Sequence, residues 1–303
     1  MEVNVKNFIF LFLAFFVFSA AHAQDYALVA HDVYLGGETK IKYDRTANKN
    51  HFKIENLLKG RVERGMSWCD GKVKLALSDP SNTEKTVTIS LEKLLIGHTC
   101  YQDESSRFYV QVGRCKLEDI FDSKLQFGSY LNGVNASYTY RDLEIKAAEL
   151  IVNTVKNQYA FMAQASYKNI PYVPCDITYS VVDWHQQDDY VVSQIAANYQ
   201  VQGSYWPMNV YAAYSRNHKK NHSNAMYAGI NFSGVNYDCV WQLDLNFQYS
   251  ERHAIPTFDY NGMGVGAGVN IKATVAFTDH LTLQSKFGIG DNESIEISTF
   301  YKW

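Results

Sequence analysis

The chain lacks the features by which soluble secreted enzymes are usually recognised. It has only 5 prolines and contains no C-x-x-C pair, so it offers no zinc or redox motif. No serine lies in a nucleophile-elbow motif near "HDVY" or "DWH", and a hydrolase triad therefore finds no support. The formal net charge of −3 and the absence of a basic tract give no reason to expect a nucleic-acid partner. We expect no enzymatic activity, no cofactor and no metal.

Long apolar runs are also missing beyond the first 23 residues. The mean hydropathy of the whole chain is −0.26. Those residues carry Lys6, then an apolar stretch from Phe8 to about Phe18, then Ala21 and Ala23 in an A-x-A arrangement. This layout predicts a secretory signal peptide cleaved after Ala23, which leaves residues 24–303 as one domain. The alternative is an uncleaved anchor, but the run is shorter than the ~17 to 25 apolar residues of a spanning helix.

Apolar residues are instead distributed with a period of two, in a chain that has 22 tyrosines and 17 phenylalanines. Alternation of one apolar and one polar face is the pattern of a β-strand. It runs through four consecutive segments near the end of the chain and through two earlier ones: residues 240–250, 264–278, 281–290, 294–303, 159–167 and 191–201.

Two all-β architectures could use such strands. A soluble sandwich usually has strands of about five or six residues. A transmembrane barrel turns its apolar face to lipid, with strands of ~9 to 11 residues and aromatic belts. The runs here are ten or more residues with polar residues near mid-strand, which favours a transmembrane antiparallel up-and-down β-barrel in a Gram-negative outer membrane.

Turn sequences set the expected strand number. "TDH", "GDNE", "CDG" at 69–71 and "LNG" at 131–133 are all read as hairpin turns. We count about fifteen strands from residue 70 onward and one or two between Tyr26 and Met66, where "NHFKIENLLKGRVERGMSW" could be strand or helix. Because single-chain bacterial barrels have even strand numbers, we expect 14 to 16 strands.

The last residue, Trp303, is an aromatic that a soluble terminus would leave uncovered. In an outer-membrane barrel the final strand is paired on both sides and its aromatic lies in the lipid interface. Bacterial barrels commonly end on such a residue, which the barrel assembly machinery reads. We therefore expect Trp303 to close the barrel, with outer-membrane lipid and that machinery as partners.

A barrel of this size has a lumen wide enough for water. Residues 107–129 join two expected strands and bring bases near acids, which would set the charge selectivity of a narrow pore. The alternative is an ordinary solvated loop. The candidate constriction residues are Arg107, Arg114, Glu118, Asp119 and Asp122.

The same segment carries a family resemblance. "VGRCKLEDIFDSKLQFGSYLNGV" resembles the G-R-R-x-L-x-D-x-F-D-S stretch of outer-membrane porins from the Chlamydiales, and "NAMYAGINFSGV", "WQLDLNFQYSERHAIPTFDYNGMGVG" and "TDHLTLQSKFGIG" resemble later strands of that family. The likeness spans roughly residues 105–303. It implies a sugar-porin-like diffusion channel for small hydrophilic solutes and ions, without a cofactor. Cys115 replaces the second arginine of the pattern, and the chain is shorter than typical members.

Five cysteines are unusual for a porin, and an exported chain meets an oxidising compartment. Their odd number leaves at least one thiol free or bonded to another chain, so disulfide-linked or trimeric self-association is open, as is a role for the thiols as small hydrophobes. A structural or adhesive barrel cross-linked through cysteines is the alternative function. His218 and His222 lie in a loop among lysines that would repel a metal cation. The disulfide candidates are Cys69, Cys100, Cys115, Cys175 and Cys239.

Overall fold

The computed structural model describes residues 27–30, 32–46, 49–80, 86–116, 120–121, 130–152, 159–185, 190–203, 206–236, 239–254, 266–290 and 294–302. Its regular structure consists of 17 β-strands. Among the described residues, no helix is long and apolar enough to cross a bilayer. The strands are β1 Ala27–Ala30, β2 Val33–Thr46, β3 Lys49–Arg64, β4 Ser67–Pro80, β5 Thr86–Gln102, β6 Ser106–Lys116, β7 Tyr130–Tyr140, β8 Leu143–Val152, β9 Tyr159–Tyr167, β10 Cys175–His185, β11 Tyr190–Val201, β12 Met208–Asn217, β13 Asn224–Asn236, β14 Cys239–Ser250, β15 Gly266–Ala276, β16 Leu281–Gly290 and β17 Ser294–Lys302.

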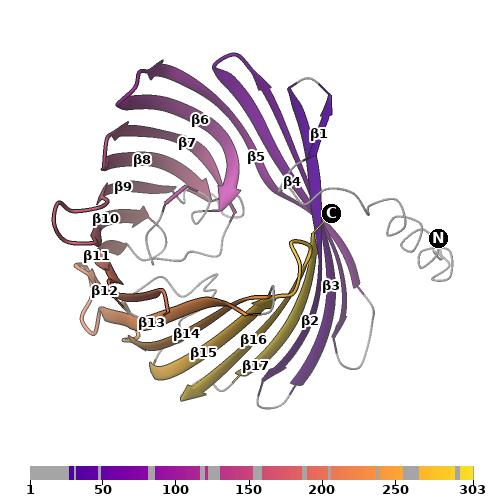
Figure 1. Ribbon diagram of the computed structural model, residues 1–303. Helices are drawn as coiled ribbons and strands as arrows, with labels where there is room; N and C mark the ends of the chain where they lie inside the picture. The colour runs from indigo at the N-terminus through magenta and orange to yellow at the C-terminus, as the bar shows by residue number, and fades with distance from the viewer. Residues whose placement is uncertain are drawn as a thin grey trace.

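All strands except β1 form one closed antiparallel ring, which gives 17 − 1 = 16 strands (Figure 1). Each strand from β2 to β17 pairs with the next one in the chain, and β17 pairs with residues 38–46 of β2 to close the ring. The short strand β1 pairs with residues 33–35 of β2, beyond the end of β17. The predicted up-and-down barrel of 14 to 16 strands is confirmed.

The outer face of the ring is apolar, as the alternation predicts. Strand β9 shows the pattern most clearly, since exposed and buried residues alternate from its first residue to its last. Phe161 on β9 is 46% exposed and Leu245 on β14 is 37% exposed, and each points away from the lumen. Apolar side chains exposed all round a closed sheet are what a lipid environment requires. The fold is therefore that of a transmembrane barrel.

Two predicted turns are wrong, and one open region is settled. Residues 69–71 lie inside β4 and residues 131–133 inside β7, so the sequence count of strands after residue 70 was too high. A glycine inside a strand marks a close backbone approach as well as a turn. A Cβ on Gly133 would meet the Glu149 carbonyl oxygen at 2.0 Å, and such closeness needs glycine. The uncertain region before residue 70 forms the long strands β2 and β3.

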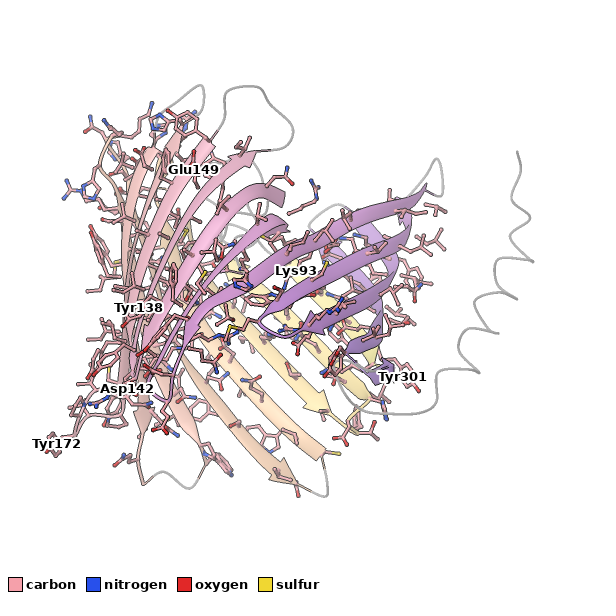
Figure 2. The ribbon with its side chains drawn as sticks, turned by 90° about the horizontal axis from the view of Figure 1, so that it is seen from above. Lys93, Tyr138, Asp142, Glu149, Tyr172 and Tyr301 are labelled. Atoms are coloured by element: carbon pink, nitrogen blue, oxygen red, sulfur yellow. The ribbon has the colours of Figure 1, made fainter. Side chains whose placement is uncertain are left out.

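The even strand number places the beginning of β2 and the end of β17 at the same rim, which we call the terminal rim. The opposite edge, the loop rim, carries the connections 117–129 and 251–265, the longest between strands of the ring. Exposed aromatics mark both rims on the outside, as in the belts of membrane barrels. Those near the terminal rim include Tyr138 (labelled in Figure 2), Tyr140, Tyr167, Tyr199 and Trp206, and those near the loop rim include Tyr43, Phe52, Tyr159, Tyr214 and Tyr249.

Candidate pore and its inner wall

Ion pairs cover the inner wall where the ring closes. Because Ile41 and Tyr43 on β2 are exposed on the outside, Lys40 and Lys42 point inward. The carboxylate of Glu296 on β17 lies 3.4 Å from the Lys40 ammonium and 3.0 Å from that of Lys42. Lys40 also lies over the Phe300 ring at 4.8 Å from its centroid, which explains why an aromatic occupies a lumen position of β17. The seam is therefore closed by charge pairs as well as by backbone hydrogen bonds.

The ion pairs continue across β3, β4 and β5. Lys53 lies 2.7 Å from the Glu55 carboxylate, and Lys74 is paired with both Glu55 and Glu92. The outward residues of these strands are apolar and exposed, among them Leu58, Val73 and Leu94. The charged side chains therefore face the lumen.

A β-bulge in β5 reverses its inside–outside alternation. The register with β4 shifts between Lys72 and Val73, so that Lys93 pairs with Lys72 but Leu91 pairs with Val73, and Glu92 is the extra residue. Leu91 and Leu94 are exposed on the outside, whereas both Glu92 and Lys93 lie on the inside. A bulge re-aims side chains in this way. It delivers two adjacent charges to the lumen, and Lys93, labelled in Figure 2, pairs with Asp70 at 2.8 Å.

A polar hydrogen-bond network centred on one carboxylate covers the inner wall of β12 to β15. Its centre is Asp244, which accepts hydrogen bonds from the Tyr211 hydroxyl at 2.7 Å, from Asn246 Nδ2 at 2.8 Å and from Asn231 Nδ2 at 3.3 Å. The Tyr211 and Tyr227 rings are stacked with centroids 5.3 Å apart. These side chains come from neighbouring strands, so the wall presents hydroxyl, amide and carboxylate groups to the lumen.

An apolar sector of the inner wall holds part of the connection between β6 and β7. Ile120 and Phe121 are 7% and 3% exposed. They belong to one buried cluster with inward-facing residues of β8 to β11, which include Leu150, Met162, Val182, Trp184 and Val192. Because the outer residues of these strands are exposed, this contact places Ile120 and Phe121 inside the barrel. This anchor was not predicted from the sequence. The signal that could have indicated it is the presence of apolar residues at inward positions, such as Leu150, Met162 and Val182.

The predicted site residues do not all lie together. Arg107 faces inward, where its guanidinium lies 5.7 Å from the centre of the Trp68 ring and donates to Thr99 Oγ1 at 3.3 Å. Arg114 pairs in register with the exposed Leu94, so it belongs to the outer face, and its Nε donates to the Leu91 carbonyl at 2.9 Å. Glu118, Asp119, Asp122 and Trp303 lie outside the described residues, as does the predicted signal peptide.

Two connecting segments hold carboxylates in the charged form. A hydrogen bond from the Tyr101 hydroxyl, with others from the backbone N–H groups of Ser105 and Ser106, lowers the pKa of Asp103 at the terminal rim. At the loop rim, the backbone N–H of Asn224 donates to Glu251 at 2.8 Å and lowers its pKa. Each rim therefore keeps a negative charge fixed by its turn geometry.

The five cysteines are all described, and none forms a disulfide within the chain. Cys115 is buried in the apolar inner cluster, whereas Cys69, Cys100, Cys175 and Cys239 lie on strand ends at the terminal rim. His218 accepts or donates a hydrogen bond with Ser193 Oγ at 2.7 Å. Within the described ranges, no three His, Cys, Asp or Glu residues gather as a metal site.

Searches with the sequence match no known family profile and no curated protein. Solved structures do match. A high-pH structure of Pseudomonas putida OprB superposes with a TM-score of 0.67 at 9% sequence identity, covering 91% of this chain and 95% of that one. This chain has the porin fold. A low-pH structure of the same protein gives a TM-score of 0.63 at 10% identity, covering 91% and 94%. A triple mutant of Rhodopseudomonas blastica porin gives 0.62 at 10% identity, covering 89% and 100%. At these identities the likeness to porins concerns the fold.

Proposed function

We propose that the chain is an outer-membrane porin, a water-filled channel for the passive diffusion of small hydrophilic solutes and ions. The observation that carries the proposal is the closed ring of sixteen strands with an apolar outer face and an inner wall that is charged or polar outside the sector of β8 to β11. Rings of eight strands are filled by their own side chains, whereas those of sixteen leave an aqueous channel. The porin fold of the solved neighbours supports the same function.

The proposal includes the route to the membrane and the family. The chain is exported with residues 1–23 as a cleaved signal peptide, and is inserted into the outer membrane of a Gram-negative bacterium by the barrel assembly machinery, which reads Trp303. Its similarity to porins of the Chlamydiales over residues 105–303 supports membership of that family. It has no enzymatic role.

Reconstitution of residues 24–303 tests the channel. We expect stepwise ohmic conductance in planar bilayers and swelling of liposomes in small sugars, because a wet lumen conducts without a binding step. The same preparation, heat-denatured, is the control. A folded barrel that shows neither conductance nor swelling would contradict the channel and favour the alternative, a structural or adhesive barrel whose thiols link copies of the chain. Non-reducing gels would then show disulfide-linked oligomers.

The constriction is part of the proposal. Ile120 and Phe121 anchor the β6–β7 connection inside the barrel, and this proposal places their neighbours Glu118, Asp119 and Asp122 beside the pore in the half nearer the loop rim. Arg107 lies farther along the ion path, toward the terminal rim. Fixed charges in a narrow wet pore bias which ions enter it.

Neutralising the acids and neutralising the arginine of this constriction should change the ion selectivity in opposite directions. Asp119→Asn with Asp122→Asn should shift the reversal potential in a salt gradient toward anion preference, and Arg107→Gln should shift it toward cation preference. Arg114→Gln is the matched control, since Arg114 lies on the outer face and should leave selectivity unchanged. The shifts should shrink at 1 M salt, where screening acts within about 3 Å. Unchanged selectivity in the first two variants would place this segment outside the ion path.

A further inference from the structure

Three lysines lie side by side across the inner wall. Lys59 on β3 pairs in register with Lys72 on β4, and Lys72 pairs with Lys93 on β5. All three point into the lumen, because Leu58, Val73 and Leu94 beside them are exposed on the outside. We call them the lysine row. The β5 bulge creates it, since the alternation of β5 before the bulge would place Lys93 outside.

Like charges directly opposite each other in a sheet are destabilising. The acids of this wall pair with only one of the three lysines. Asp70 pairs with Lys93, whereas no ion pair joins Lys59 or Lys72 to any of the described residues. Glu38, the nearest acid on β2, pairs in register with Leu57 and forms no ion pair with Lys59.

The other carboxylates of the wall already have partners. Glu55 is paired with Lys53 and Lys74, and Glu92 with Lys74. Glu63 is paired with Arg61. Two neighbouring ammonium groups are therefore left over at mid-wall, on strands about 4.8 Å apart, a spacing that lets two flexible lysines reach one oxyanion.

The row has a continuation toward the terminal rim. The inward line of β5 runs from Lys93 to Thr99, a path of about 20 Å, and Thr99 accepts a hydrogen bond from Arg107. Arg107 has no carboxylate partner among the described residues. Its guanidinium instead lies over the Trp68 and Tyr109 rings, at 5.7 and 5.3 Å from their centres. Arg107 is thus a third cation without an ion pair to the described residues on this side of the lumen, independent of the lysine row.

From this arrangement we propose that the inner wall of β3 to β6 is an anion track, on which small phosphorylated or carboxylated solutes bind transiently at the lysine row and leave past Arg107. Bound oxyanions supply the negative charge that the row lacks. The inference rests on the proposed channel function and adds its solute class. The network on β12 to β14 is centred on the carboxylate of Asp244, and Lys272 on β15 pairs in register with that acid, so this part of the wall differs from the lysine row in having an acid directly beside its lysine.

The test uses inorganic phosphate and chloride as probes in planar bilayers. Wild-type channels should have a chloride-to-potassium permeability ratio above one, and phosphate should reduce the chloride current in a concentration-dependent way. In the Lys59→Gln, Lys72→Gln double variant, the half-blocking phosphate concentration should rise about fivefold or more, because one short-range charge contact in water is worth about a factor of five. The permeability ratio should fall with it.

Two matched variants separate charge from folding. Lys59→Arg with Lys72→Arg keeps both charges and should keep the phosphate block. Lys168→Gln with Lys219→Gln removes two charges from connections at the rims and should behave as wild type. Conductance with no anion preference, or a phosphate block unchanged in the Gln variant, overturns the anion track and leaves the channel standing. Absence of conductance in the wild type overturns the channel itself, and the anion track with it.

Discussion

Replacing Leu245 with arginine is expected to destabilise the barrel by about 2 to 4 kcal/mol, the range for a cationic side chain at the bilayer midplane. Leu245 lies near the middle of β14, is 37% exposed and points to lipid. In register it pairs with Ile230 on one side and with Ile271 on the other, so no polar group of the outer face is directly beside it. An arginine there must carry its guanidinium through the hydrocarbon to reach water.

The matched variant is Gln242→Arg on the same strand, which places the same side chain in the lumen. Gln242 is exposed there and donates to Asn231 Oδ1 at 3.1 Å, so the change should cost at most about 1 kcal/mol. Reversible unfolding in detergent or lipid vesicles, followed by tryptophan fluorescence, measures the difference. A loss of stability for Gln242→Arg as large as that for Leu245→Arg would contradict the assignment of Leu245 to the lipid face, and a larger one would mean that the two faces of β14 are reversed.

Trp184→Ala is expected to cost about 3 to 5 kcal/mol, the range for removing a large aromatic from a packed site. Trp184 is 0% exposed and lies in the inner cluster that also contains Ile120 and Phe121. Removing the indole takes away part of the surface on which the β6–β7 connection is held. We therefore expect noisier single-channel currents as well as lower stability, because the anchored segment gains freedom inside the lumen.

Val181→Ala serves as the control, since Val181 is on the same strand but faces outward. It should lower stability only slightly and leave current noise unchanged. A Trp184→Ala barrel that unfolds within about 1 kcal/mol of wild type, with quiet currents, would show that the cluster does not hold the connection.

The outer face was predictable from sequence, whereas much of the inner face was not. Charged side chains are costly near the bilayer midplane, so apolar residues such as Leu245 and Phe161 recur at every second position there. That constraint is local and can be read from one strand at a time. The predicted range of 14 to 16 strands came instead from counting segments and from the even strand number of bacterial barrels, and it includes the observed 16 although two of the turns used in the count were wrong.

Features that depend on the pairing of neighbouring strands could not be predicted from the sequence. Gly133 resembles a turn glycine in "LNG", yet its role is set by the approach of the β8 backbone. The bulge at Glu92 has no local signal, and without it the lysine row would not form and Lys93 would be assigned to lipid. The outward position of Arg114 likewise follows from its register with β5.

The seam between β17 and β2 governs how the chain must fold. The Lys40–Glu296 ion pair joins residues 256 positions apart, so almost the whole chain has to be ordered before this contact can form. Contacts of such sequence separation form late, because the entropy of closing a long loop must be overcome first. Until then β2 and β17 each present an open edge of unpaired backbone groups, which can pair with another chain. Ring closure is thus the kinetic step at which a newly made chain either becomes a barrel or aggregates.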